Sequence, residues 1–160
     1  MTVDTSVIGA KTGAWRVTVE RAPVANFARV LGDKNPVLAD TPAPPTFSFV
    51  MAYWGAYADD QPPDPTGGTN PMHRIMGELF AKGALVLHGE QEFEYLHPVY
   101  AGDSLTGQGR ISNVEKRPGK RGGEMTLVTM ETEYKNQRGE VCMVSRSTII
   151  ETAKPVEKKD

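Results

Sequence analysis

The stretch PTFSFVMAYWGAYA, residues 45–58, decides how the rest of the chain can be arranged. Its apolar and aromatic side chains leave no face of a helix polar, and a helix that is apolar all round must be enclosed by other elements. Pro44 and Pro45 suit the start of such a helix, where no backbone N–H is needed. We therefore expect a central helix here. The alternative is a buried strand, because short apolar runs rich in aromatic residues also occur in strands.

The chain has 160 residues, which is enough for one domain with a substantial core, and we expect a single domain over 1–160 with flexible ends at 1–13 and 153–160. Its 18 Lys+Arg against 20 Asp+Glu provide no broad cationic surface, which argues against nucleic acid as a partner. No apolar run is long enough to span a membrane, and the first residues lack the pattern of an export signal. We therefore expect a cytoplasmic protein. The single cysteine, Cys142, suits a reducing compartment and is interpreted as core filler.

Hydrophobic periodicity predicts the other elements. A two-residue alternation predicts a strand over 15–20, and an apolar stripe predicts a helix over 21–31 that ends at Gly32. A short helix is expected over 72–80, after a loop rich in Pro and Gly. Four long strands are then expected as neighbours in a meander, over 85–96, 103–116, 124–134 and 140–152. This order predicts an α+β fold, with an antiparallel sheet on one side of a helix.

Three segments carry a resemblance to a known family. They are GDKNPVLAD at 32–40, APPTFSF at 43–49 and LHGEQEFEYLHPVYAGDSL at 87–105. Together they resemble the MaoC-like (hydratase 2) family of (R)-specific enoyl-CoA hydratases and 3-hydroxyacyl dehydratases, in its N-terminal, FAS1-like dehydratase branch. The resemblance covers most of residues 15–150. It implies the hot-dog fold, in which an antiparallel β-sheet is wrapped around a central α-helix.

One position departs from the family motif, which runs Gly-Asp-x-Asn-Pro-x-His. The motif aspartate is matched by Asp33, but its histidine is matched by Leu38. Leucine cannot accept or donate a proton, so the acid–base pair that the resemblance implies is incomplete unless another residue or another chain supplies the imidazole. The resemblance assigns Asp33 as the base or water-orienting acid, and Asn35 as the residue that shapes the turn around the substrate.

The start of the central helix supplies candidate hydrogen-bond donors for the carbonyl oxygen of the thioester substrate that the resemblance implies. Backbone N–H groups of Thr46 and Phe47 lie in its first turn, where a helix has unpaired donors and a favourable dipole. Donors of this kind can polarise a carbonyl group as an oxyanion hole does. We therefore expect Thr46 and Phe47 to contact the substrate.

Within the strand predicted over 85–96, the candidate for supplying an imidazole is His88. Strict alternation puts His88 on the same face as Glu90, Glu92 and Glu94, which is a solvated face or an interface between subunits. A bulge at Gly89 would instead turn His88 inward. The glutamates lie along a line rather than converging, so they predict no metal site. The resemblance implies no cofactor.

Three functions fit these observations. The first is a hydratase or dehydratase acting on an acyl-CoA or acyl-ACP thioester through a 2-enoyl/3-hydroxyacyl pair, with a partner subunit or His88 supplying the imidazole. The second is a non-catalytic acyl-binding subunit of a heteromeric dehydratase, which Leu38 favours. The third is a hot-dog thioesterase, which would need a carboxylate that residues 45–58 lack. Because exposed sheet edges are usually paired, we expect a homodimer or a heterodimer with another hot-dog subunit.

Overall fold

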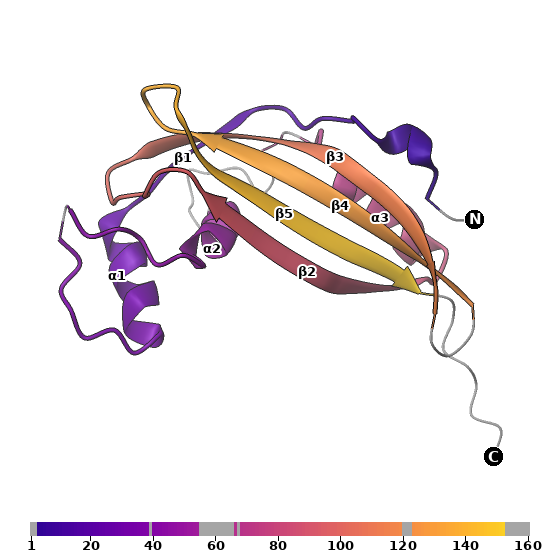
Figure 1. Ribbon diagram of the computed structural model, residues 1–160, viewed down its shortest axis with the longest axis horizontal. Coiled ribbons are helices and arrows are strands. Elements are labelled where there is room, and N and C mark those ends of the chain that lie inside the picture. The colour runs from indigo at the N-terminus through magenta and orange to yellow at the C-terminus, as the bar shows by residue number, and fades with distance from the viewer. Residues whose placement is uncertain (1–2, 39, 55–65, 67, 120–122, 153–160) are drawn as a thin grey trace, which may run out of the picture.

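The computed structural model describes residues 3–38, 40–54, 66, 68–119 and 123–152, without the side chains of 52–54. Figure 1 shows its elements along the chain. They are the 3-10 helix η1 (Thr5–Val7), β1 (Trp15–Thr18), α1 (Arg21–Val30), α2 (Phe47–Trp54), α3 (Pro71–Ala81), β2 (Leu85–Tyr95), β3 (Ser104–Pro118), β4 (Glu124–Lys135) and β5 (Val141–Thr152). The helices and strands predicted from periodicity are therefore present, and their ends differ from the predicted ones by at most two residues.

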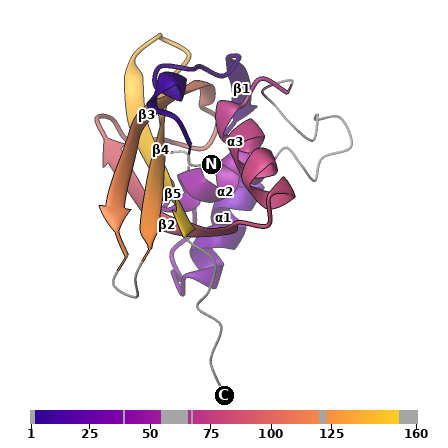
Figure 2. The ribbon, with the colours of Figure 1, turned by 90° about the vertical axis from the view of Figure 1, so that its right-hand side faces the viewer.

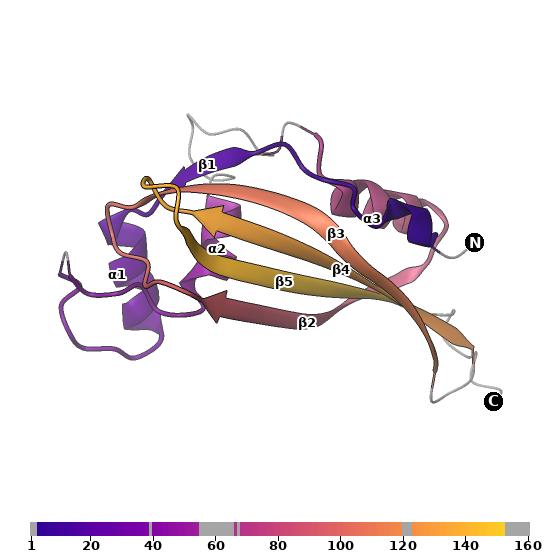
Figure 3. The same cartoon turned by 45° about the horizontal axis from the view of Figure 1, so that its top comes forward.

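The five strands form one curled antiparallel sheet in the order β1-β3-β4-β5-β2 (Figures 1 and 3). The predicted meander is correct for β3, β4 and β5. It is wrong for β2, which pairs with β5 at the far edge instead of with β3. The hydrophobic pattern of a strand specifies which face is buried but not which neighbour it pairs with, so this arrangement depends on the tertiary structure.

The helices α1, α2 and α3 all lie on one face of the sheet, as Figure 2 shows from the end of the molecule. Helix α2 begins at Phe47, two residues after the predicted start, and residues 55–58 of the predicted helix lie outside the described residues. Phe47 and Met51 are buried in the core, but Phe49 is 40% exposed. The helix is therefore not enclosed on every side, because Phe49 faces a cavity. An enclosed helix would also bury Trp54, whose side chain lies outside the described part.

The N-terminal segment, for which we expected flexibility, lies along β3. The amides of Gly9 and Thr12 donate to the carbonyl oxygens of Ile111 and Gly109 at 2.8 and 2.9 Å. Thr12 is also buried, with its hydroxyl accepting a hydrogen bond from the amide of Gly109. These backbone hydrogen bonds cover the edge of β3 beyond the short strand β1.

The core consists of two hydrophobic clusters on the helical face of the sheet. One joins α1 and α2 to the sheet through residues such as Phe47, Leu105 and Met143. The other joins α3 to the sheet through residues such as Ile75 and Ile149. None of the helices in the described part of the chain has the length and apolar character needed to cross a membrane.

Candidate active-site cavity

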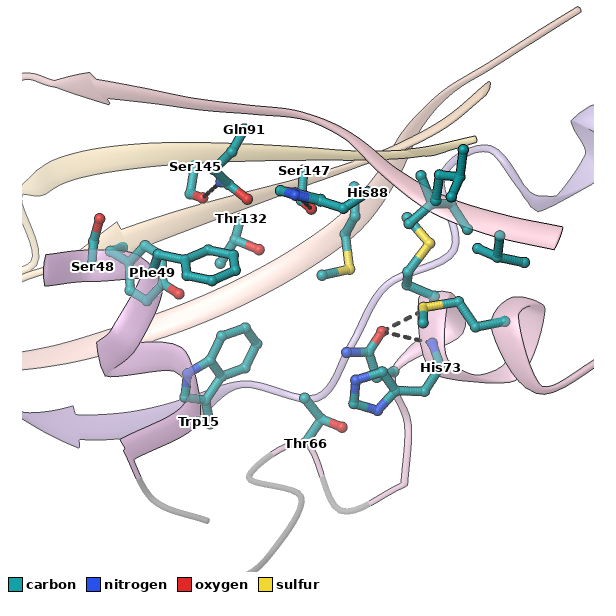
Figure 4. A pocket seen from close by; sticks show the side chains of 18 of the residues that line it. Trp15, Ser48, Phe49, Thr66, His73, His88, Gln91, Thr132, Ser145 and Ser147 are labelled. Carbon is teal, nitrogen blue, oxygen red and sulfur yellow. Dashed lines mark hydrogen bonds between the residues drawn. The ribbon is translucent and has the colours of Figure 1, made fainter. Parts of the chain in front are cut away.

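A cavity of about 520 Å³ lies on the helical face of the sheet, beside both hydrophobic clusters (Figure 4). The sheet provides one wall, and the helices α2 and α3 provide the other. Most of the lining is apolar, with a small number of polar side chains, which is typical of a pocket for a small organic ligand. Its sheet wall includes Trp15, Val86, Leu87, His88, Gln91, Met130, Thr132, Tyr134, Ser145, Ser147 and Ile149, and its helical wall includes Ser48, Phe49, Met72, His73, Met76 and Phe80.

A β-bulge brings His88 into this cavity. His88 pairs with Ile149 and Glu90 pairs with Thr148, so Gly89 is the extra residue opposite β5. The extra residue reverses the alternation on one side of the bulge. The expectation that His88 shares a face with Glu90 is therefore wrong, and the alternative of a bulge at Gly89 is correct. His88 shares the inner face with the buried residue Ile149.

Two pairs of polar side chains lie next to each other on this wall. His88 Nε2 and Ser147 Oγ are 3.4 Å apart, and Gln91 Nε2 donates to Ser145 Oγ at 2.8 Å. The ring of Phe49 on α2 faces the imidazole of His88, with the ring centres 5.9 Å apart. Figure 4 shows His88, Gln91 and the two serines along the sheet, Phe49 on α2 and His73 on the opposite wall. Sequence analysis missed the serines, although their alternate spacing in β5 indicates a shared face.

The opposite wall is built on the first turns of α3. Asn70 caps this helix, because its Oδ1 accepts hydrogen bonds from the amides of Met72 and His73 at 2.9 and 3.4 Å. Pro71 follows in the first helical position, where the missing N–H costs nothing. The cap fixes the point where α3 begins and so places His73 at the cavity. No Asp or Glu is present among the described residues that line the cavity.

The GDKNP turn lies outside the cavity lining. Gly32 adopts a φ of +85° after α1, and the amide of Asp33 donates to the carbonyl of Ala28 at 3.0 Å, which closes a Schellman motif. Asp33 Oδ1 then accepts from the amide and the side chain of Asn35, both at 2.9 Å. Asp33, Asn35 and Leu38 are all exposed. These contacts explain Asp and Asn as turn-forming residues.

The first turn of α2 is tied to the edge strand β2. The hydroxyl of Tyr95 donates to the carbonyl of Pro45 and lies 3.1 Å from Ser48 Oγ. Burial raises the pKa of Tyr95, and the hydrogen bond to Ser48 partly opposes this shift. The amide of Phe47 donates to the carbonyl of Pro44 at 2.9 Å, so this expected donor already has an acceptor. Thr46 is exposed, and neither Thr46 nor Phe47 lines the cavity.

The outer face of the sheet, which faces away from the cavity, carries a network of ion pairs. Arg146 binds Glu92, Glu94 and Glu131 at 2.7, 3.1 and 2.8 Å. Hydrogen bonds from Arg110 and Arg146 hold the pKa of Glu131 below its usual value. Glu92 and Glu94 thus share one arginine with Glu131. No cluster of three or more potential metal ligands occurs in the part of the chain that the structure describes.

Comparisons with known proteins agree with this architecture. A UPF0336 protein of Streptomyces avermitilis is 28% identical over 146 residues, which cover 84% of this chain and 85% of that protein. The ChsH1–ChsH2 complex of Mycobacterium tuberculosis is similar in structure, with a TM-score of 0.65 and 16% identity over 92% of this chain and 90% of that chain. The truncated HadBC (3R-hydroxyacyl-ACP dehydratase) complex of the same organism has a TM-score of 0.60 and 19% identity over 94% of this chain and 99% of that chain.

The family described as FAS1-like, dehydratase domain region matches residues 6–145. This range contains the α1 helix, the GDKNP turn, most of the sheet and all the cavity-lining residues except Ser147 and Ile149. The curled antiparallel sheet and the similar HadBC and ChsH1–ChsH2 structures confirm the predicted hot-dog fold. The chain therefore belongs to the FAS1-like dehydratase domain family, and its fold is similar to that of solved MaoC-like dehydratases.

Proposed function

We propose that this chain is the acyl-binding subunit of a hot-dog hydratase or dehydratase that acts on a 2-enoyl or 3-hydroxyacyl thioester. A second hot-dog subunit supplies the acid–base pair. The observation that carries this proposal is the cavity of about 520 Å³, which has an apolar lining and no acidic residue among its described members. A site of this kind can bind an acyl chain. Its described lining contains no carboxylate that could activate water.

The residues of the family motif also support the proposal that this chain binds the acyl group and a second subunit supplies the acid–base pair. Leu38 occupies the position of the motif histidine and is 49% exposed. Asp33 lies in an exposed turn, where its Oδ1 accepts two hydrogen bonds from Asn35. Acid–base catalysis needs a proton-transferring group within hydrogen-bonding reach of the reacting atoms. Neither Asp33 nor Leu38 lines the cavity.

The edge of β2 provides the surface for the second subunit. The other edge of the sheet is formed by β1 and by the N-terminal segment that pairs with β3. In the described part of the chain, no strand pairs with the outer edge of β2. An uncovered strand edge can add the strand of another chain. Two structures of similar fold are complexes, named HadBC and ChsH1–ChsH2, which supports a hot-dog partner.

The experiment uses trans-2-decenoyl-CoA with the chain alone, and with a hot-dog subunit that carries the Asp and the His of the motif. Calorimetry measures binding, and mass spectrometry of the thioester measures the addition of water. We expect the chain alone to bind the thioester without hydrating it, and the mixture to hydrate it. Absence of binding, or release of free CoA by the chain alone, would contradict the proposal.

A matched pair of variants tests whether the cavity is the binding site. Met76→Trp places a larger side chain at a half-buried position of the cavity wall and should abolish binding of decenoyl-CoA. Val30→Trp introduces the same side chain at a position on α1 that is 78% exposed and should leave binding intact. Circular dichroism of both variants controls for folding. Equal affinities in the two variants would place the thioester elsewhere.

One observation favours a second candidate, which is hydration by this chain alone. The bulge at Gly89 places His88 in the cavity with its Nε2 3.4 Å from Ser147 Oγ. A histidine there could act as a general base for water. Hydration by the chain alone, lost in His88→Gln with binding retained, would establish this candidate.

A further inference from the structure

The sheet wall of the cavity carries a band of hydrogen-bonding side chains, which we call the polar row: Thr132, Ser145, Gln91, Ser147 and His88. The row crosses three neighbouring strands. Thr132 lies opposite Ser145, and Ser147 lies opposite Gln91. His88 follows on the next rung through the bulge. All five side chains line one cavity, and Figure 4 shows them along its sheet side.

The polar row has an apolar region at each of its two ends. Along β5, the inward positions run Met143, Ser145, Ser147, Ile149, so the two serines lie between two buried apolar residues. The cavity itself extends to Tyr134 on the side of Met143, with which Tyr134 pairs. A ligand that follows this wall therefore meets apolar, polar and again apolar surface.

The groups of the polar row have hydrogen-bonding capacity that the described part of the chain does not use. Gln91 donates to Ser145, but its carbonyl oxygen accepts no hydrogen bond within the described residues. The hydroxyl of Thr132, a residue that is 5% exposed, likewise makes no hydrogen bond there. Among the residues that the structure describes, the hydroxyl of Ser147 has only the long contact of 3.4 Å with His88. These atoms lie at the cavity, where a ligand can complete their hydrogen bonds.

An unsubstituted alkyl chain is poorly matched to this wall. It would remove water from these groups without replacing the hydrogen bonds, which costs roughly fivefold to a hundredfold in affinity for each group left unpaired. An oxygen atom on the chain can donate to or accept from a serine, a threonine or a glutamine amide. The chemistry of the wall therefore favours a chain with an oxygen function between two apolar parts.

We propose that the cavity takes acyl groups that carry a hydroxyl or keto oxygen in the middle of the chain, and that the polar row selects them over plain alkyl chains. This inference rests on the proposed function, since it assumes that the cavity holds the acyl part of a thioester. The carrier arm of coenzyme A contains amides that could also bind polar groups. Ligands that share one carrier and differ only in the acyl chain separate these two possibilities.

The test measures binding of three thioesters to the full chain by calorimetry: decanoyl-CoA, a mid-chain hydroxydecanoyl-CoA and the isomer with its hydroxyl at the chain end. We expect the mid-chain isomer to bind about tenfold more tightly than decanoyl-CoA, as for one or two added hydrogen bonds. The chain-end isomer should show a smaller gain, because its hydroxyl extends past the polar row.

Two variants test whether the polar row causes the preference. Ser147→Ala should weaken binding of the mid-chain isomer severalfold and strengthen binding of decanoyl-CoA, because the group that an alkyl chain leaves unpaired is gone. Ser104→Ala makes the same change at a half-buried position of β3 outside the cavity lining and should preserve the preference. Thermal melts confirm that both variants fold.

Each outcome decides one of the two proposals. Equal affinity of the wild-type chain for all three thioesters would overturn this inference and leave the acyl-binding function intact. Equal weakening of all three by Ser147→Ala would also overturn it, since the polar row would then bind the common carrier. Failure of every thioester to bind would refute the proposed function itself.

Discussion

Gly89 is the residue that lets β2 bulge and present His88 to the cavity, and the substitution Gly89→Ala tests this role. A Cβ atom at Gly89 would lie 2.6 and 2.7 Å from Cγ1 and Cδ1 of Ile150, and 3.3 Å from the carbonyl oxygen of Thr148. Ile150 is β-branched, so moving its Cγ1 requires a change of a restricted χ1 angle. Overpacking of this kind costs about 1–3 kcal/mol of the free energy of unfolding.

Urea denaturation measures this loss. With a slope of about 2 kcal/mol per molar urea, the midpoint of Gly89→Ala should fall by roughly 0.5–1.5 M. The added Cβ atom displaces the backbone at the bulge, which also presents His88 to the cavity. The affinity of the Gly89→Ala variant for decenoyl-CoA should therefore fall as well.

The matched control is Gly77→Ala in α3, where a Cβ atom would have no neighbour within 4 Å. Alanine in a helix interior is favoured over glycine, so this variant should gain about 0.5–1 kcal/mol. The same chemical change is thus expected to have opposite signs at the two positions. An unchanged or raised midpoint in Gly89→Ala would refute the packing that we describe around the bulge.

Three further predictions follow from the described contacts. Asp33→Asn should change the hydration rate of the assembled complex by less than about threefold, whereas loss of a general base would lower the rate by a factor of about 10²–10⁴. Steady-state kinetics distinguish these two results. In the same assay, Leu38→His should give the chain alone no hydration activity. The lowered pKa of Glu131 stabilises the fold above the unfolded carboxyl pKa of about 4.3, and this contribution disappears as the pH falls through the lower folded pKa. Urea midpoints measured from pH 6 down to about pH 3 should therefore fall more steeply in the wild-type chain than in Glu131→Gln. Cys142 is buried, burial raises the pKa of its thiol, and its Sγ donates to the carbonyl of Tyr134. A thiol reagent should therefore react with Cys142 only at urea concentrations that unfold the chain. Immediate reaction in buffer would contradict the burial of Cys142.

The sequence by itself determined the local elements, because their causes are local. The apolar stripe of α1 and the glycine after it predict both the helix and its end at Gly32, which the structure shows as a Schellman motif. The alternation of apolar residues predicts all four long strands. The family motifs indicated the hot-dog fold, and the exchange of the motif histidine for Leu38 is visible without a structure.

Only the tertiary structure decided what lies at the cavity. His88 faces inward because Gly89 fits against Ile150 of a strand some sixty residues away in the chain, which strict alternation within β2 cannot indicate. Asp33 and Asn35, which the motif singles out, satisfy each other in an exposed turn, whereas Gln91, Ser145 and Ser147 meet through pairing of β2 with β5. Periodicity records which face of a strand is buried. The partners across that face are set by long-range pairing, and here they determine the chemistry of the site.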